Sequence, residues 1–229
     1  MKKTLLSIAL TSLFTLSTTV STSALAFEES GLNGVEGLSA NVGVVSQYFF
    51  RGVAQTDSAS ASAGLDYEIG NFSVGTWVAD VSDGLEVDIY GAYGLSFDNG
   101  FGLSAGFTSY QYTGDFDTSY NEVNLGASFS FVSVAYSVGV WEDGILDDND
   151  NPIDDADYDF LSITGEYEGF YATYGTWGQD LDGDYFELGY GTSVSGFDIG
   201  VAAIINSKEL DGETGDGDES LVFSIAKSF

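Results

Sequence analysis

The chain has 229 residues, five basic and 36 acidic side chains, no histidine and no cysteine, and a formal charge of −31 at pH 7. So acidic a surface repels nucleic acid, because phosphate binding requires lysine and arginine. The missing histidine excludes serine–histidine hydrolysis and the common zinc sites. Paired carboxylates alone can hydrolyse glycosides, but nothing in the sequence places two of them convincingly in a cleft. We therefore expect no enzyme and no nucleic-acid partner.

The N-terminus predicts a cleaved export signal. Two lysines precede an apolar stretch, residues 5–16, and residues 24–26 (Ala-Leu-Ala) have the small-x-small form of a cleavage site. Cleavage after Ala26 would leave residues 27–229 as a single mature domain. No other segment approaches the ~18 apolar residues of a membrane-spanning helix.

Apolar and polar residues alternate with a period of two through the mature chain. In residues 197–205 every odd-numbered position is apolar, and no stretch shows a convincing amphipathic helix. Segments near the ~9–11 residues of a tilted membrane strand recur along the chain. The pattern predicts strands at 38–51, 58–69, 72–80, 85–97, 101–112, 119–129, 131–141, 158–168, 170–178, 185–195, 197–206 and 220–229.

The connections between these strands alternate between short and long. The short ones are 70–71, 98–100, 130, 169 and 195–196, and the long ones are 52–57, 81–84, 113–118, 142–157, 179–184 and 207–219. Short periplasmic turns and long outer loops are typical of bacterial outer-membrane proteins. We predict an all-β, antiparallel, up-and-down transmembrane β-barrel of about twelve strands in the outer membrane of a Gram-negative cell.

Phenylalanines mark one predicted edge of this barrel. They stand at or beside every short connection and at the C-terminus: Phe72, Phe101, Phe129, Phe131, Phe170, Phe197 and Phe229. An aromatic girdle at the inner membrane interface explains that spacing, whereas ordinary sandwich core residues would not follow every second turn. We expect contact with lipid and lipopolysaccharide, and an oligomer is left open.

The last strand resembles the signal that the barrel-assembly machinery reads. Leu221, Phe223, Ile225 and the terminal Phe229 share one face. Lys227 departs from the pattern, because an apolar residue is usual there, but a lysine near the interface can snorkel. We expect the assembly machinery to recognise the chain through Phe229.

Residues 42–57 resemble the start of the TorF-family putative porins. The shared pattern is Ser-x-Tyr-x-x-Arg-Gly-x-x-Gln-Thr, which here runs from Ser46 to Thr56. Further similar segments are 64–67, 75–77, 86–91 and 222–229, so the resemblance spans nearly the whole mature chain. It implies an outer-membrane barrel that acts as a porin.

Strand parity places six acids inside the predicted barrel, because each alternates with apolar neighbours: Asp66, Glu86, Asp88, Glu122, Glu166 and Glu187. Arg51, predicted at the top of the first strand, should point inward or rim the mouth and find a carboxylate partner. These residues would line a water-filled, cation-favouring pore. In the alternative, side chains fill the lumen and Arg51 is the hub of an ion-pair network with Glu86, Asp88 or Glu122.

Two acidic runs in the predicted loops are rich in oxygen ligands suited to calcium. They contribute Asp180, Asp182 and Asp184, and Asp147, Asp148 and Asp150. Neither run has the twelve-residue EF-hand spacing, so a solvated acidic surface is the favoured interpretation. Calcium is the one cofactor that the sequence suggests.

The leading hypothesis is a porin-like channel for passive diffusion of small hydrophilic solutes, weakly selective for cations. The alternative is a plugged barrel with a structural or adhesive role, in which loops 142–157 and 207–219 form the contact surface and the acidic loops bind divalent cations. A secreted soluble β-sandwich is a third interpretation, but it predicts a polar outer face, and these stripes are apolar.

Overall fold

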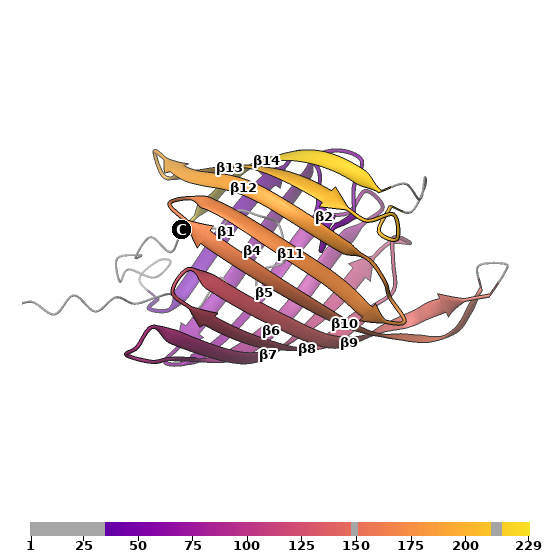
Figure 1. The fold of residues 1–229 in the computed structure, drawn as a ribbon, viewed down its shortest axis with the longest axis horizontal. Coiled ribbons are helices and arrows are strands. Elements are labelled where there is room, and N and C mark those ends of the chain that lie inside the picture. Colours follow the sequence, from indigo (N-terminus) through magenta and orange to yellow (C-terminus); the bar gives the residue numbers. More distant parts are fainter. Residues whose placement is uncertain (1–34, 148–150, 212–216) are drawn as a thin grey trace, which may run out of the picture.

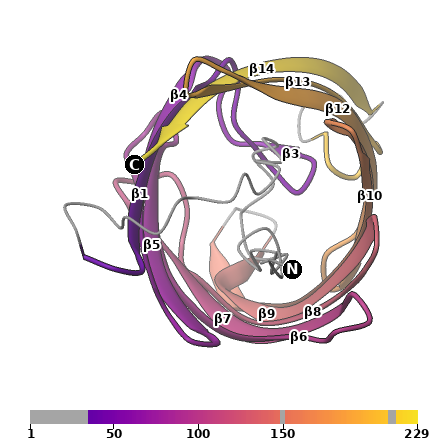
Figure 2. The ribbon, with the colours of Figure 1, turned by 90° about the vertical axis from the view of Figure 1, so that its left-hand side faces the viewer.

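The computed structural model describes residues 35–147, 151–211 and 217–229. Twelve antiparallel strands form a closed barrel, in which each strand pairs with its neighbour along the chain and the first pairs with the last (Figures 1 and 2). The predicted twelve-stranded up-and-down barrel is confirmed. The strands are β1 (Leu38–Val45), β4 (Ser60–Ile69), β5 (Phe72–Asp80), β6 (Leu85–Ser96), β7 (Phe101–Thr113), β8 (Tyr120–Phe129), β9 (Val132–Leu146), β10 (Pro152–Tyr167), β11 (Phe170–Gln179), β12 (Asp184–Val194), β13 (Phe197–Asn206) and β14 (Asp218–Ser228).

The seam between β1 and β14 closes the sheet. Asn41–Val45 pair with Ser224–Ser228, and Ala40 and Phe229 exchange backbone hydrogen bonds of 3.2 and 2.9 Å. A closed sheet satisfies backbone donors and acceptors without free edges, which stabilises a chain that has no disulfide. Within the described residues, no helix is both long and apolar enough to cross a membrane.

The two ends of the barrel differ. At the short-turn end, tight turns join β4 to β5, β6 to β7, β8 to β9, β10 to β11 and β12 to β13. Two of these turns, Glu168-Gly169 and Ser195-Gly196, have positive φ at both residues, as a type I′ hairpin turn requires. At the opposite, long-loop end, the β9–β10 hairpin reaches beyond the other strands (Figure 1).

The outer face of the barrel is apolar. Alternate residues of the strands leave large hydrophobic side chains exposed, among them Val74, Ile89, Phe107, Leu188 and Phe223. At the short-turn end, Phe72, Phe129, Phe131, Phe170, Phe197 and Phe229 are all exposed, while Phe101 is half-buried against Phe97. An aromatic belt therefore lies along this edge, where the sequence predicts it.

The predictions for two segments are wrong. The first strand does not run from 38 to 51: it ends at Val45, and residues 46–59 turn inward before β4 begins. The segment 142–157 is not one long loop, because β9 continues to Leu146 and β10 begins at Pro152. Strand pairing persists there despite the many acids, since the extended hairpin leaves their side chains exposed to solvent.

Candidate functional site

The inward segment 46–59 forms a small hairpin inside the barrel (Figure 2). Its strands, β2 (Phe49–Phe50) and β3 (Val53–Ala54), pair with each other and with no other strand of the described residues. Arg51 and Gly52 form the tip, with φ angles of 48° and 88°, both in the left-handed region that a type I′ turn needs. Glycine adopts this conformation freely, whereas arginine is disfavoured there, so contacts of its side chain must offset the cost.

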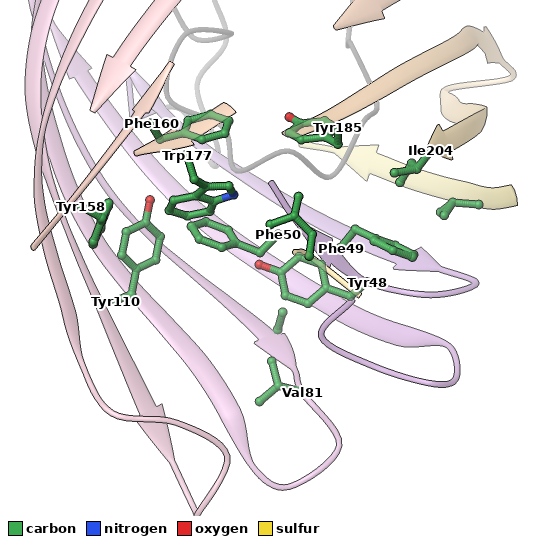
Figure 3. Packing of buried hydrophobic residues seen from close by; sticks show 13 residues of the cluster. Tyr48, Phe49, Phe50, Val81, Tyr110, Tyr158, Phe160, Trp177, Tyr185 and Ile204 are labelled. Atoms are coloured by element: carbon green, nitrogen blue, oxygen red, sulfur yellow. The ribbon is translucent and has the colours of Figure 1, made fainter. Parts of the chain in front are cut away.

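Apolar packing fills the lumen around the hairpin (Figure 3). The ring of Phe50 lies 5.4 Å from that of Tyr110 and 5.9 Å from that of Trp177, between centroids. A Cβ at Gly52 would stand 2.8 Å from atoms of Tyr185, so the tip touches the wall directly. The cluster joins the hairpin to strands on several sides of the barrel through Val81, Tyr158, Phe160, Ile204 and Val222.

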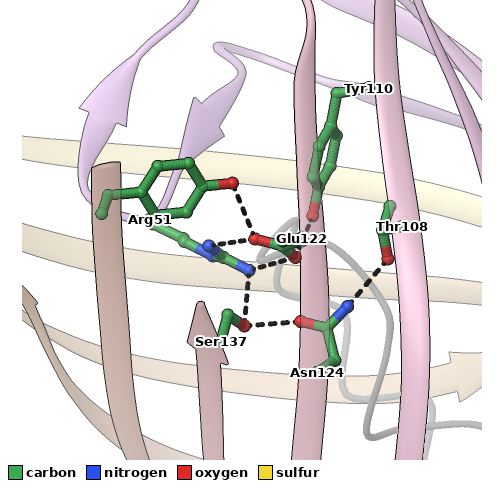
Figure 4. A network of polar contacts seen from close by, with 7 residues as sticks. Arg51, Thr108, Tyr110, Glu122, Asn124 and Ser137 are labelled. Carbon is green, nitrogen blue, oxygen red and sulfur yellow. Dashed lines mark hydrogen bonds and ion pairs between the residues drawn. The ribbon is translucent and has the colours of Figure 1, made fainter. Parts of the chain in front are cut away.

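Arg51 makes a bidentate ion pair with Glu122 of β8 (Figure 4). Its Nη1 donates to Oε2 at 2.9 Å, its Nη2 donates to Oε1 at 2.8 Å, and Nη2 also donates to Ser137 Oγ at 3.2 Å. Tyr110 and Tyr158 donate their hydroxyls to the same carboxylate, at 2.7 and 3.0 Å. Glu122 therefore accepts four hydrogen bonds in a buried position, which is the condition for a stable buried charge pair.

The guanidinium is also enclosed by aromatic rings. Its carbon lies 4.5 Å from the ring centroid of Phe160, 4.9 Å from that of Phe50 and 5.5 Å from that of Trp177. Burial alone would lower the pKa of Arg51, but the adjacent Glu122 carboxylate raises it above its ordinary value, so the side chain stays charged. Trp177 Nε1 donates to the Arg51 carbonyl at 3.1 Å, which fixes the tip further.

A second carboxylate holds the base of the hairpin. Glu86 of β6 accepts the Tyr48 hydroxyl at 2.7 Å and the Tyr112 hydroxyl at 2.9 Å. Two residues further along β6, Asp88 is fully buried, and neither of its carboxylate oxygens has a hydrogen-bond partner among the described residues. Asp88 pairs in register with Tyr110 of β7, whose ring packs on Phe50, so this carboxylate adjoins a wall residue that contacts the hairpin.

Carboxylate, glycine and tyrosine recur in order across neighbouring strands of the lumen wall. Asp66, Gly75 and Tyr90 lie in one register on β4, β5 and β6, and the Tyr90 hydroxyl donates to Asp66 at 2.6 Å. On β8, β9 and β10 the same order is Glu122, Gly139 and Tyr158. The glycine leaves room for the ring to lie flat on the wall, because a Cβ at Gly75 would come within 2.6 Å of Tyr90. Tyrosines thus reach carboxylates two strands away.

Toward the short-turn end the lumen wall carries small side chains. The inward positions there alternate with the exposed apolar ones and are glycine, serine or alanine on most strands. They include Gly102, Ser104 and Gly106 on β7, and Gly189, Gly191 and Ser193 on β12. The lumen is therefore filled by side chains around the hairpin. Between the hairpin and the short-turn end, its wall carries small residues.

The structure brings most of the predicted lumen acids to the inner wall. Glu86, Asp88, Glu122 and Glu187 are buried, and Tyr171 donates its hydroxyl to Glu187 at 2.5 Å. Asp66 also faces inward, as its bond to Tyr90 shows. Glu166 lies an even number of residues from the inward-facing Phe160 on β10, so it is on the lumen side of that strand. It is exposed near the short-turn end.

Arg51 has the carboxylate partner that its inward position predicts, but it lies at the tip of the inward hairpin rather than at the top of a strand. The residues of the Ser46–Thr56 pattern build this hairpin: Ser46 Oγ accepts from the Phe223 backbone at 2.9 Å. Thr56 Oγ1 accepts from the Tyr48 backbone, also at 2.9 Å. Sequence analysis found these residues through the resemblance but missed their path.

No group of three or more Asp, Glu, His or Cys side chains that could hold a metal ion occurs in residues 35–147, 151–211 and 217–229. Asp180 and Asp182 accept backbone hydrogen bonds from Asp157 and Gly183, and Asp147 bonds to Asn151. Asp184 lies at the start of β12. Asp148 and Asp150, like the predicted export signal 1–26, lie outside the described residues. Calcium binding stays a prediction.

Comparisons with known proteins agree with the fold. The family described as "Bacterial protein of unknown function (Gcw_chp)" matches residues 29–209, and no curated protein matches the chain. The solved structure named "KdgM porin" is 10% identical with a TM-score of 0.54, over 83% of this chain and 99% of that one. Another, named "Unveiling the Mechanism Behind the in-meso Crystallization of Membrane Proteins", is 10% identical with a TM-score of 0.52, over 83% of both chains. Identities this low establish a shared barrel fold alone.

Proposed function

The chain belongs to the Gcw_chp family of bacterial proteins of unknown function, and we propose that it is an outer-membrane channel for small hydrophilic solutes, closed by its inward hairpin. One observation carries the proposal. The barrel has an apolar outer face around an inner wall of carboxylates, hydroxyls and glycines. That distribution is the reverse of a soluble protein and suits a lipid exterior with a water-filled interior.

Membrane placement follows from the two ends of the barrel. The aromatic belt at the short-turn end suits the inner membrane interface, with the long-loop end and the extended β9–β10 hairpin facing outward. Lys227 lies 5.1 Å from the ring centroids of both Phe197 and Phe229, a position from which its ammonium reaches the headgroups. Lipid, lipopolysaccharide and the assembly machinery, through Phe229, are the proposed partners.

Weak selectivity for cations is part of the proposal. Six predicted lumen acids, Asp66, Glu86, Asp88, Glu122, Glu166 and Glu187, accompany one lumen arginine, Arg51. Acidic walls favour cations through the sign of their charge, without any covalent chemistry or cofactor. A TorF-type porin role, which the resemblance implies, agrees with this proposal.

A second candidate is a permanently plugged barrel with a structural or adhesive role. The hydrophobic cluster around the hairpin favours it, because Tyr48, Phe49 and Phe50 are buried as in the core of a soluble domain. In that case the exposed acidic surface near 142–157 and 207–219 would be the contact surface.

Ion conductance separates the two candidates. The chain would be produced with its own leader, purified from membranes and added to a planar bilayer under a potassium chloride gradient. We expect discrete steps in current with a cation-selective reversal potential, because thermal opening of the hairpin exposes an acid-lined path. Inserted, folded protein that never conducts, even after the hairpin is shortened, would contradict a channel and favour the plugged barrel.

A further inference from the structure

The surroundings of the Arg51 guanidinium have the composition of a binding site for an organic cation. On the wall they comprise the Glu122 carboxylate, the hydroxyls of Ser137, Tyr110 and Tyr158, and the rings of Phe160 and Trp177; we call this set the Arg51 seat. Planar guanidinium ions bind carboxylates with two parallel hydrogen bonds and stack on aromatic faces. The seat offers both kinds of contact.

We propose that the Arg51 seat is a binding site for guanidinium-bearing and related organic cations, which the chain's own arginine fills while the hairpin is inside. The inference rests on the proposed channel function and names its solute class. An incoming cation would take the place of Arg51 as the hairpin moves out. Arg51 is then a tethered competitor for the solute.

The attachment of the hairpin permits such an exchange. In the described part of the chain, the backbone of residues 47–57 makes no backbone–backbone hydrogen bond to the barrel wall. Wall side chains hold its carbonyls instead: Trp177 bonds to Arg51 and Asn206 Nδ2 bonds to Gly52 at 3.1 Å. Withdrawal of the hairpin therefore breaks side-chain contacts and leaves the barrel ladder intact.

Asp88 supplies a second, independent observation that points to a ligand. This carboxylate is fully buried on β6, in register with Tyr110 of the seat, yet both of its oxygens lack a hydrogen-bond donor among the described residues. Leaving a buried acceptor without a donor costs free energy, so such groups are rare in folded proteins. An incoming cation with several N–H groups would find in Asp88 an acceptor that the protein itself leaves unpaired.

Chemical rescue tests the seat directly. Arg51→Gly removes the side chain while keeping a residue that accepts the positive φ of the turn. We expect this variant to melt at a lower temperature than the wild type in detergent. Guanidinium chloride at millimolar concentration, far below the molar range that unfolds proteins, should restore part of the loss in a saturable way.

Four comparisons make the rescue specific. Urea has the planar shape of guanidinium without its charge and should not rescue, and sodium chloride of equal ionic strength should not rescue either. The double variant Arg51→Gly, Glu122→Gln should not respond to guanidinium, because it lacks the carboxylate. Lys208→Ala removes an exposed cation, 67% exposed, and should leave melting and its response to guanidinium as in the wild type. Equal effects of guanidinium on the single and double variants would overturn the proposal.

Bilayer recordings separate failure of the site from failure of the channel. We expect Arg51→Gly to conduct more than the wild type and to be blocked by guanidinium but not by urea. Conduction without such a block would overturn the solute assignment. If neither protein conducts, the channel function fails, and the melting experiment still decides whether the seat binds guanidinium.

Discussion

The barrel wall and the hairpin inside it are held by different forces. Each wall strand is joined to two neighbours by backbone hydrogen bonds, and closure through β1 and β14 leaves no free strand in the ring. Residues 47–57 of the hairpin are joined to the wall through side chains, chiefly those of Tyr48, Arg51 and Trp177. The ladder persists when single side chains change, whereas the position of the hairpin depends on side-chain contacts, which are the hydrophobic cluster around Tyr48, Phe49 and Phe50 and a few buried polar contacts.

This difference locates the part of the molecule that can move. In the membrane that we propose for this barrel, opening the ladder would expose backbone groups to hydrocarbon, which is prohibitively costly. Release of the hairpin exchanges buried side-chain contacts for contacts with water in the lumen, a cost that one or two substitutions can reduce. Predictions that separate the two regions follow, from the largest expected effect to the smallest.

Glu122→Gln should have the largest effect on the hairpin. The change leaves the buried Arg51 guanidinium without its countercharge, at a cost of about 3–5 kcal/mol for such pairs. Because proteolysis follows the population of the open form, trypsin should cut after Arg51 roughly 150- to 5,000-fold faster. Cutting after the exposed Lys208 is the internal reference, and an unchanged ratio of the two cuts would contradict the role of the ion pair.

Gly139→Ala should weaken the wall instead. An added Cβ would overlap the Tyr158 ring and stand 2.9 Å from the Asn121 carbonyl oxygen, so the tyrosine could no longer lie flat. Overpacking of this kind costs about 1–3 kcal/mol, measurable as a lower unfolding midpoint in urea. Gly165→Ala is the matched control, because its nearest atom, the Phe131 carbonyl oxygen, is 3.9 Å away. Equal midpoints for both variants would refute the packing argument.

Two tyrosines that donate to the same carboxylate allow a contact of the hairpin to be compared with a contact of the wall. Tyr48 donates to Glu86 from the hairpin and Tyr112 donates to it from β7. Changing either to phenylalanine removes one hydrogen bond to a buried acid, worth about 1–3 kcal/mol. Tyr48→Phe should make trypsin cut after Arg51 about tenfold faster, which corresponds to the lower end of that energy range. Tyr112→Phe should change the rate of this cut far less, because Tyr112 belongs to the wall. Equal acceleration would mean that hairpin and wall move together.

The sequence predicts the wall better than the hairpin, for a physical reason. Period-two alternation survives in most wall strands because outward-facing and lumen-facing positions alternate, so β5 and β13 begin and end at the predicted residues. Apolar residues also continue past Val45, at Tyr48, Phe49 and Phe50, and Arg-Gly is not among the dipeptides that usually signal a tight hairpin. The inward path depends on Glu122, 71 residues further along the chain, which no local pattern contains.

The sequence likewise predicts one part of the candidate site and not the other. Parity places Glu86, Asp88 and Glu122 inside the barrel without knowledge of the fold, because each alternates with apolar neighbours. Which of them pairs with Arg51 depends on where the hairpin tip lies. The register that sets Gly139 opposite Tyr158 likewise comes from pairing between strands and not from spacing along one of them.

Conductance of a protein with a shortened hairpin tests the central claim most directly. Gln55 donates its backbone N–H to the Tyr48 carbonyl at 2.8 Å, so replacing residues 49–54 by Asn-Gly should close the turn without moving β1 or β4. We predict large, steady, cation-selective steps from this variant and rarer or smaller ones from the wild type in the same bilayer. Equal conductance, or silence of a correctly folded variant, would contradict a channel that the hairpin closes.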